Sequence, residues 1–123
     1  MTRVSSSAPG KVVLAGEYVV LDGAPAVSMA VNRRAVVTLD AADELSVRSK
    51  GLDGSTDLRL FDNVRHALRS DKWCGAACLD TRAFSDANAG IKYGIGSSAA
   101  LAVALAQALA PPGMDDDLSL IHI

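Results

Sequence analysis

Two short glycine-containing segments, near opposite ends of the chain, carry the residues whose types and spacing could do chemistry. In the first, Pro9-Gly10-Lys11, a lysine directly follows a proline-glycine bend. In the second, residues 94–99 read GIGSSA and lead into an alanine-rich apolar run. A glycine turn that opens a helix lets a ligand approach the main chain and exposes unpaired N–H groups at the positive end of the helix dipole. Phosphate is the natural guest of such a turn, and a nearby lysine would add positive charge.

The second segment has other interpretations. Ser97 or Ser98 could simply cap a buried helix. The spacing also fits the dinucleotide pattern G-x-G-x-x-A, with Asp115 about twenty residues on, but no apolar strand precedes the glycines, so the context disfavours it. A nucleophile turn would need a serine between two glycines, and the Walker pattern is absent. Taken alone, the segment leaves a phosphate loop and a capped core helix open.

Composition and charge indicate one domain whose partners are small molecules. The chain has 123 residues, half of them apolar, and a formal charge of −2 with scattered lysines and arginines. This distribution does not resemble the basic surface of a nucleic-acid or membrane binder. The longest apolar stretch, residues 99–110, is shorter than the ~20 residues that span a bilayer. We therefore expect a soluble cytoplasmic protein; its oligomeric state is not readable from the sequence.

Cysteine and histidine spacing gives no indication of a metal site. Cys74 and Cys78 do not form a C-x-x-C pair, and neither His66 nor His122 has a partner at helical ligand spacing. We expect both cysteines to be reduced thiols with a structural role.

The hydrophobic pattern predicts a β-rich first half followed mainly by helices, which is an α+β arrangement. The proline-glycine step predicts that the first extended region is broken in two. Asp62 would lie in the first turn of the first helix, where an acid complements the helix dipole. The predicted elements are strands within Arg3 to Ala15 broken at residues 8–10, an extended run from Ala26 to Leu39 interrupted at residues 32–34, strands at Glu44 to Ser49 and at residues 76–84, and helices at Leu60 to Leu68 and Ser97 to Leu109.

Taken together, the segments APGKVVLAGEY (residues 8–18) and KYGIGSSAA (residues 92–100) resemble the two N-terminal motifs of the GHMP kinase superfamily. Two motifs in the right order, about eighty residues apart, are more specific than either alone. The resemblance extends to about Pro111. It implies that residues 1–117 form a partial, truncated GHMP kinase N-terminal domain of the ribosomal protein S5 domain 2-like fold, with the C-terminal ferredoxin-like domain absent. Residues 118–123 we expect to be a non-native tail.

Within the superfamily, the Gly-Glu-Tyr turn and the Lys92-Tyr93 lead look most like the phosphomevalonate kinases, with the mevalonate kinases as the close alternative. The resemblance implies transfer of the ATP γ-phosphoryl group to 5-phosphomevalonate. Lys11 would act as the catalytic residue and supply positive charge beside the acceptor phosphate. Glu17 and Tyr18 would either contact the acceptor or serve as a turn carboxylate and a packed ring. The phosphate loop would consist of Gly94, Ile95, Gly96, Ser97, Ser98 and Ala99, with Ser97 or Ser98 holding Mg2+.

Two further expectations follow from the resemblance. The family's acidic residue and third glycine-rich motif lie beyond the second motif and are absent here, so we expect negligible turnover by the chain alone. A noncatalytic nucleotide-binding fragment is therefore the alternative from a different functional class. Lys92 and the acidic residues Asp115, Asp116 and Asp117 we interpret as solvated charges.

Overall fold

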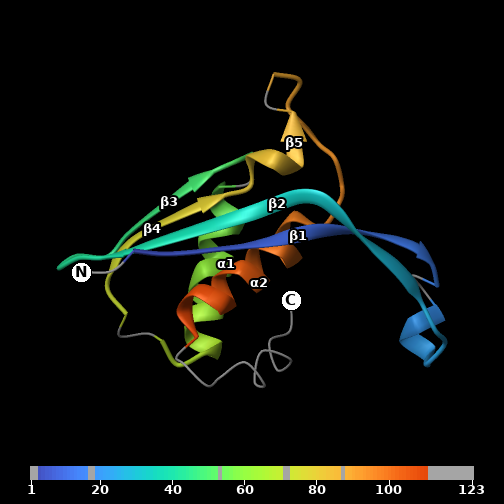
Figure 1. Cartoon of the computed structure of the whole chain (residues 1–123), viewed down its shortest axis with the longest axis horizontal. Coiled ribbons are helices and arrows are strands. Elements are labelled where there is room, and N and C mark those ends of the chain that lie inside the picture. The colour runs from blue at the N-terminus through green and yellow to red at the C-terminus, as the bar shows by residue number, and fades with distance from the viewer. Residues whose placement is uncertain (1–2, 17–18, 53, 71–72, 87, 111–123) are drawn as a thin grey trace.

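The computed structural model describes residues 3–16, 19–52, 54–70, 73–86 and 88–110. Its central feature is a four-stranded sheet of order β1-β2-β4-β3, with two helices packed against one face (Figure 1). This is an α+β fold, as the sequence predicts. The elements are β1 (Arg3–Ala15), a short 3-10 helix η1 (Val19–Asp22), β2 (Val27–Ala41), β3 (Ser46–Lys50), α1 (Gly54–Ala67), β4 (Gly75–Asp80), a second 3-10 helix η2 (Arg82–Phe84), β5 (Ser85–Asp86), β6 (Ile91–Lys92) and α2 (Ser97–Leu109).

Strands β1 and β2 form a long antiparallel ribbon that extends beyond the rest of the sheet, with η1 near its tip (Figure 1). The sequence predicted two extended pieces in the first region and an interrupted second run, but each is one strand. The pairing register changes where those breaks were expected: Pro9 pairs with Arg34, whereas Lys11 pairs with Ala30. A bulge of this kind lets the ribbon bend without ending, and it accommodates a proline that cannot donate a ladder hydrogen bond.

Strands β3 and β4 are parallel neighbours connected through α1, so helices and strands are interleaved along the chain rather than separated. The predicted helix at Leu60 to Leu68 exists, but it begins at Gly54. The acidic residue of its first turn is therefore Asp57 and not Asp62. The early start was missed because the first turn, Gly-Ser-Thr-Asp, contains no apolar residue that would extend the helical period.

The core lies between the sheet and the helices. Alternate residues of β4 and of the second half of β2 point inward and are buried, as the period of two along a strand requires. Helix α2 packs against β1, β2 and α1, and its many alanines let it approach the sheet closely. The inward-facing residues are Ala35, Val37, Leu39, Ala77 and Leu79 from the sheet, Phe61 and Val64 from α1, and Ala100, Leu101, Ala102, Ala104, Leu105, Ala106 and Leu109 from α2.

Two further findings concern the described part of the chain. None of its helices is long and apolar enough to cross a membrane. Cys74 and Cys78 are free, and both are partly buried.

Candidate phosphate-binding site

The two glycine-containing segments meet in the structure. The backbone N–H of Lys11, in β1, donates a hydrogen bond to the carbonyl oxygen of Ile95 at 2.8 Å. Gly10 makes this approach possible, because a Cβ there would overlap both the Ile95 oxygen and the ring of Phe84. On the other side, a Cβ at Gly96 would lie only 3.4 Å from Cγ of Lys11. The fold therefore brings the lysine and the glycine loop into direct contact.

The loop ends where helix α2 begins. Gly96 is the N-cap residue, in the left-handed conformation with φ of 80°, and its carbonyl oxygen accepts the Ala100 N–H at 3.0 Å. The alternative in which Ser97 or Ser98 caps the helix is not what the structure shows: both are already helical, and among the described residues no side chain caps the helix. The first N–H groups of a helix have no partner one turn earlier. At the start of α2 these groups, with the positive end of the helix dipole, form a site suited to an anion.

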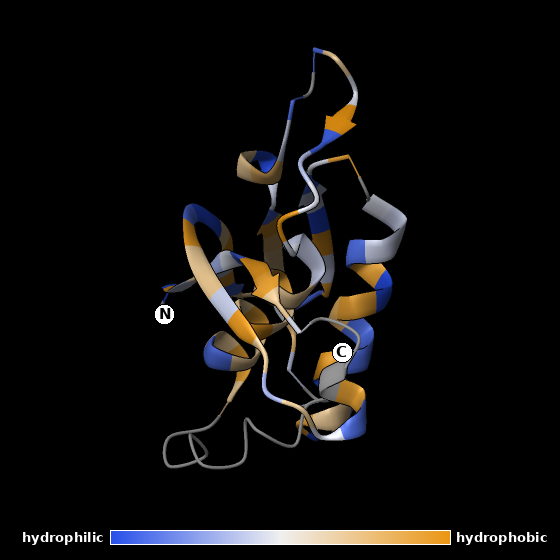
Figure 2. Cartoon of the chain, turned by 90° about the vertical axis from the view of Figure 1, so that its right-hand side faces the viewer, coloured by the Kyte–Doolittle hydropathy of each residue, from blue (hydrophilic) through white to orange (hydrophobic). Residues whose placement is uncertain are grey.

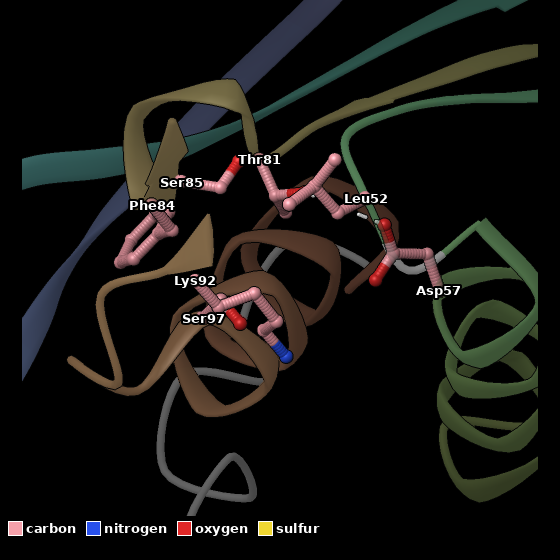
Figure 3. Close-up of a pocket in the computed structure, with 7 residues that line it drawn as sticks. All are labelled: Leu52, Asp57, Thr81, Phe84, Ser85, Lys92 and Ser97. Atoms are coloured by element: carbon pink, nitrogen blue, oxygen red, sulfur yellow. Dashed lines mark hydrogen bonds between the residues drawn. The ribbon is translucent and has the colours of Figure 1, made fainter. Parts of the chain in front are cut away.

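A small, shallow pocket that is partly open to solvent lies beside this helix start. Ser97 and Lys92 line it together with Asp57, and Figure 3 shows the stem of Lys92 running beside the Ser97 hydroxyl. Lys92 is exposed, and its place at the pocket was not predicted. Ser98 does not line this pocket. The remaining lining residues are Leu52, Thr81, Phe84 and Ser85.

Asp57 is the feature of this region that sequence reasoning missed. Its side chain is only 4% exposed, and its Oδ2 accepts hydrogen bonds from Ser49 Oγ at 2.8 Å and from Thr81 Oγ1 at 3.4 Å. Its position in the first turn of α1 also places the carboxylate at the positive end of a helix dipole. An acid at a helix start is usually exposed, so only a correct helix boundary together with the buried Thr81 could have indicated this contact.

An ion pair fixes the chain just before η2. Arg82 binds Asp80 through two contacts, Nη2 to Oδ2 at 2.8 Å and Nε to Oδ1 at 3.0 Å. The backbone N–H of Arg82 also donates to Asp80 Oδ1 at 3.1 Å. Hydrogen bonding by the guanidinium holds the pKa of Asp80 below its ordinary value. The turn that follows β4 is therefore braced on both sides of Thr81.

Several of the predicted residues lie outside the described part of the chain. These are Glu17, Tyr18, Asp115, Asp116, Asp117 and residues 118–123. The structure brings Lys11 into contact with Ile95 and Gly96 of the predicted loop. Among the described residues, no group of three or more histidine, cysteine, aspartate or glutamate side chains is placed to hold a metal ion.

A mixed sheet with two helices on one face, and a glycine loop that opens the buried helix beside a strand lysine, is the α+β fold of GHMP kinase domains. No family model matches the chain. The sequence is 36% identical, over 112 residues, to a mevalonate kinase from Methanothermobacter thermautotrophicus; the match covers 87% of this chain and 36% of that protein. The chain thus spans little more than a third of this relative's length.

Solved structures share this fold. A Lin0012 protein from Listeria innocua matches 88% of this chain, and 36% of its own, with a TM-score of 0.70 and 26% identity. Phosphomevalonate kinase from Streptococcus pneumoniae, solved in complex with phosphomevalonate and AMPPNP, matches all of this chain and 38% of its own, with a TM-score of 0.66 and 19% identity. The chain is therefore similar in sequence to a mevalonate kinase, and its fold matches that of GHMP kinase domains, with kinases of the mevalonate pathway among the proteins it resembles. These comparisons do not favour phosphomevalonate kinase over mevalonate kinase.

Proposed function

We propose that this chain forms the phosphate-binding part of an ATP-dependent kinase that phosphorylates mevalonate or 5-phosphomevalonate. The observation that carries the proposal is the contact between Lys11 and the loop that opens α2. Phosphoryl transfer depends mainly on positioning and on electrostatic stabilisation of the transferred group. A lysine beside an anion-binding helix start supplies both.

The residues take separate roles in this proposal. Backbone N–H groups of the loop from Gly94 to Ala99 hold the ATP phosphates, and the Lys11 ammonium lies beside the phosphoryl group as it passes to the acceptor. The P–O bond to ADP breaks as the bond to the acceptor oxygen forms. Mg2+, when bound, neutralises charge on the phosphates; a serine hydroxyl is a suitable hard ligand, and the pocket favours Ser97 over Ser98 for this contact.

Each acceptor is favoured by a different observation. The 36% identity to a mevalonate kinase favours mevalonate. The Lys92-Tyr93 lead favours 5-phosphomevalonate, and so does the lysine stem at the pocket, because a second cation offsets repulsion between two phosphates. The acceptors also differ in chemistry: a phosphate oxygen attacks without losing a proton, whereas the mevalonate hydroxyl must give its proton to a base.

The test is an ATP-consumption assay of the whole protein that contains this chain, with each acceptor supplied separately. Turnover with one acceptor identifies the kinase. The 123-residue chain by itself should bind Mg·ATP and turn over neither acceptor. Nucleotide binding by the whole protein without turnover of either acceptor would support a noncatalytic nucleotide-binding protein instead, and absence of nucleotide binding would exclude both. Cytoplasmic location remains a prediction.

A further inference from the structure

Phe84 contacts both segments of the candidate site, the β1 strand that carries Lys11 and the chain that leads into the glycine loop. Its ring is 2% exposed and contacts the strand at Gly10, next to Lys11. Its carbonyl oxygen accepts the Tyr93 N–H at 2.9 Å, immediately before the glycine loop. A shift of Phe84 would therefore displace the start of the loop and the lysine strand together.

The position of Phe84 is set in turn by Thr81. The Phe84 N–H donates to the Thr81 carbonyl oxygen at 3.0 Å, closing the turn that contains η2. The Thr81 N–H donates to the carbonyl oxygen of Lys50 at 2.8 Å. Thr81 packs so closely against Gly51 that a Cβ on that glycine would overlap its hydroxyl oxygen. Thr81 is thus held by the end of β3 as well as by its own turn.

Asp57 completes this arrangement from α1. It accepts the Thr81 hydroxyl and the Ser49 hydroxyl on the same oxygen, Oδ2, and Figure 3 shows it on the opposite side of the pocket from Ser97. A buried carboxylate is costly unless it is hydrogen-bonded, so Asp57 depends on these donors. The Thr81 hydroxyl also lies 3.5 Å from the Lys50 carbonyl oxygen, which is a second acceptor for it. The contacts form one continuous path from Asp57 through Thr81 and Phe84 to the loop and Lys11.

We propose that Asp57 is a positioning residue of the phosphate loop, which acts through Thr81 and Phe84 to hold the loop against Lys11. Its role in catalysis rests on the proposed function, whereas its effect on the loop does not. The proposal predicts that loss of the carboxylate loosens the loop more than it loosens the sheet.

Hydrogen exchange of individual amides measures this difference without any ligand. In Asp57→Ala, the amides of Tyr93 and Lys11 should exchange about 10-fold faster relative to those of the β2–β4 ladder, which corresponds to the loss of about one net hydrogen bond. Val64→Ala is the control, because it removes buried apolar volume from the same helix and leaves the Asp57 and Thr81 hydrogen bonds in place. It should speed all these amides in proportion. An equally uniform change in Asp57→Ala would overturn the proposal.

Two further variants test whether the effect of Asp57 passes through the Thr81 hydroxyl. Asp57→Asn keeps an oxygen acceptor for the hydroxyls and should restore most of the protection at Tyr93 and Lys11. Thr81→Val removes only the hydroxyl and should reproduce the Asp57→Ala pattern; it carries the test if Asp57→Ala does not fold. A Thr81→Val protein with wild-type exchange at both amides would refute the path.

Binding of Mg·ATP, measured by calorimetry on the same proteins, separates this proposal from the function. Affinity should fall about 10-fold in Asp57→Ala and recover in Asp57→Asn. Unchanged affinity in an Asp57→Ala protein with a loosened loop would overturn the link from loop position to nucleotide binding. Absence of binding by the unmodified chain would count against the proposed function, while the exchange results would still decide the role of Asp57.

Discussion

The N–H of Lys11 and the carbonyl oxygen of Ile95 are 2.8 Å apart, and this main-chain bond joins two segments that lie about eighty residues apart in the sequence. Because the bond uses no side chain, the Lys11 ammonium stays exposed and available to a ligand. The structural and chemical roles of Lys11 can therefore be separated by mutation.

Lys11→Ala should leave the fold intact and remove activity. The backbone bond to Ile95 remains, so the free energy of unfolding should change by no more than about 0.5 kcal/mol, as for other exposed substitutions. In the whole protein, kcat should fall about 100-fold or more, which is typical for loss of one stabilising charge at a transferred group. Denaturant unfolding and an ATP-consumption assay measure the two effects. Full activity in Lys11→Ala would refute the assigned role. Lys11→Arg keeps the positive charge and tests whether charge alone maintains kcat.

Gly10→Ala should destabilise the chain strongly, because the added methyl group overlaps the Ile95 carbonyl oxygen and the Phe84 ring, and neither can move freely. We expect a loss of about 1–3 kcal/mol, the usual cost of overpacking. Gly54→Ala is the matched control: a Cβ there meets nothing closer than 4.0 Å, at the start of α1. It should be neutral or slightly stabilising. Equal midpoints for the two variants in urea unfolding would mean that Gly10 is not packed as described.

Helix α2 offers a test of the core through two residues close together on it. Leu105 is fully buried, whereas Val103 is 43% exposed. Leu105→Ala should lower the free energy of unfolding by about 2–5 kcal/mol, and Val103→Ala by far less, because only the first leaves a cavity. Urea unfolding of both variants measures the difference. Similar losses would show that α2 is not buried on the face described.

The success at α2 and the failure at α1 show which features of a sequence predict structure. The predicted bounds of α2, Ser97 to Leu109, are those observed, because a glycine precedes its unbroken apolar run and prolines follow it. Helix α1 was placed too short because its first turn is polar. Its one buried residue there, Asp57, is stabilised by Thr81, a partner that no local pattern could indicate.

Strand continuity and the shape of the site depend on the same kind of long-range contact. Proline and glycine in β1 indicate a break when read locally, but pairing with β2 carries the strand through a bulge. The two motifs predicted which residues would belong to the phosphate loop. They did not predict that Lys11 would contact Ile95, or that Phe84 would support both, because those distances arise only when the sheet is assembled.

The arm formed by the outer part of the β1–β2 ribbon and by η1 carries apolar residues, and these show another limit of local patterns. Leu14 and Leu21 are 58% and 85% exposed, and in Figure 2, where this end of the molecule faces the viewer, orange segments mark the hydrophobic residues of the arm. The β-rich pattern correctly predicted strands here. It could not show that part of the ribbon extends past the helices and so leaves apolar side chains in solvent.

The ion pair between Asp80 and Arg82 predicts a pH dependence of stability. The guanidinium lowers the pKa of Asp80 in the folded chain below the value of about 3.9 expected in the unfolded chain. The unfolded state therefore binds more protons as pH falls, so the contribution of the pair is present above pH ~4 and is lost as pH falls through the lowered pKa. Because Arg82 is 65% exposed, that contribution should not exceed about 1 kcal/mol.

Arg82→Ala should accordingly lower the free energy of unfolding at pH 7, and its difference from the unmodified chain should shrink toward pH 3. Urea unfolding at pH 7, 5 and 3 measures this difference, and added salt should reduce it at pH 7. Arg59→Ala, which removes an exposed arginine of α1, controls for the change in net charge. A difference for Arg82→Ala that stayed constant across this range, or that matched Arg59→Ala at each pH, would mean that the pair does not brace the turn around Thr81.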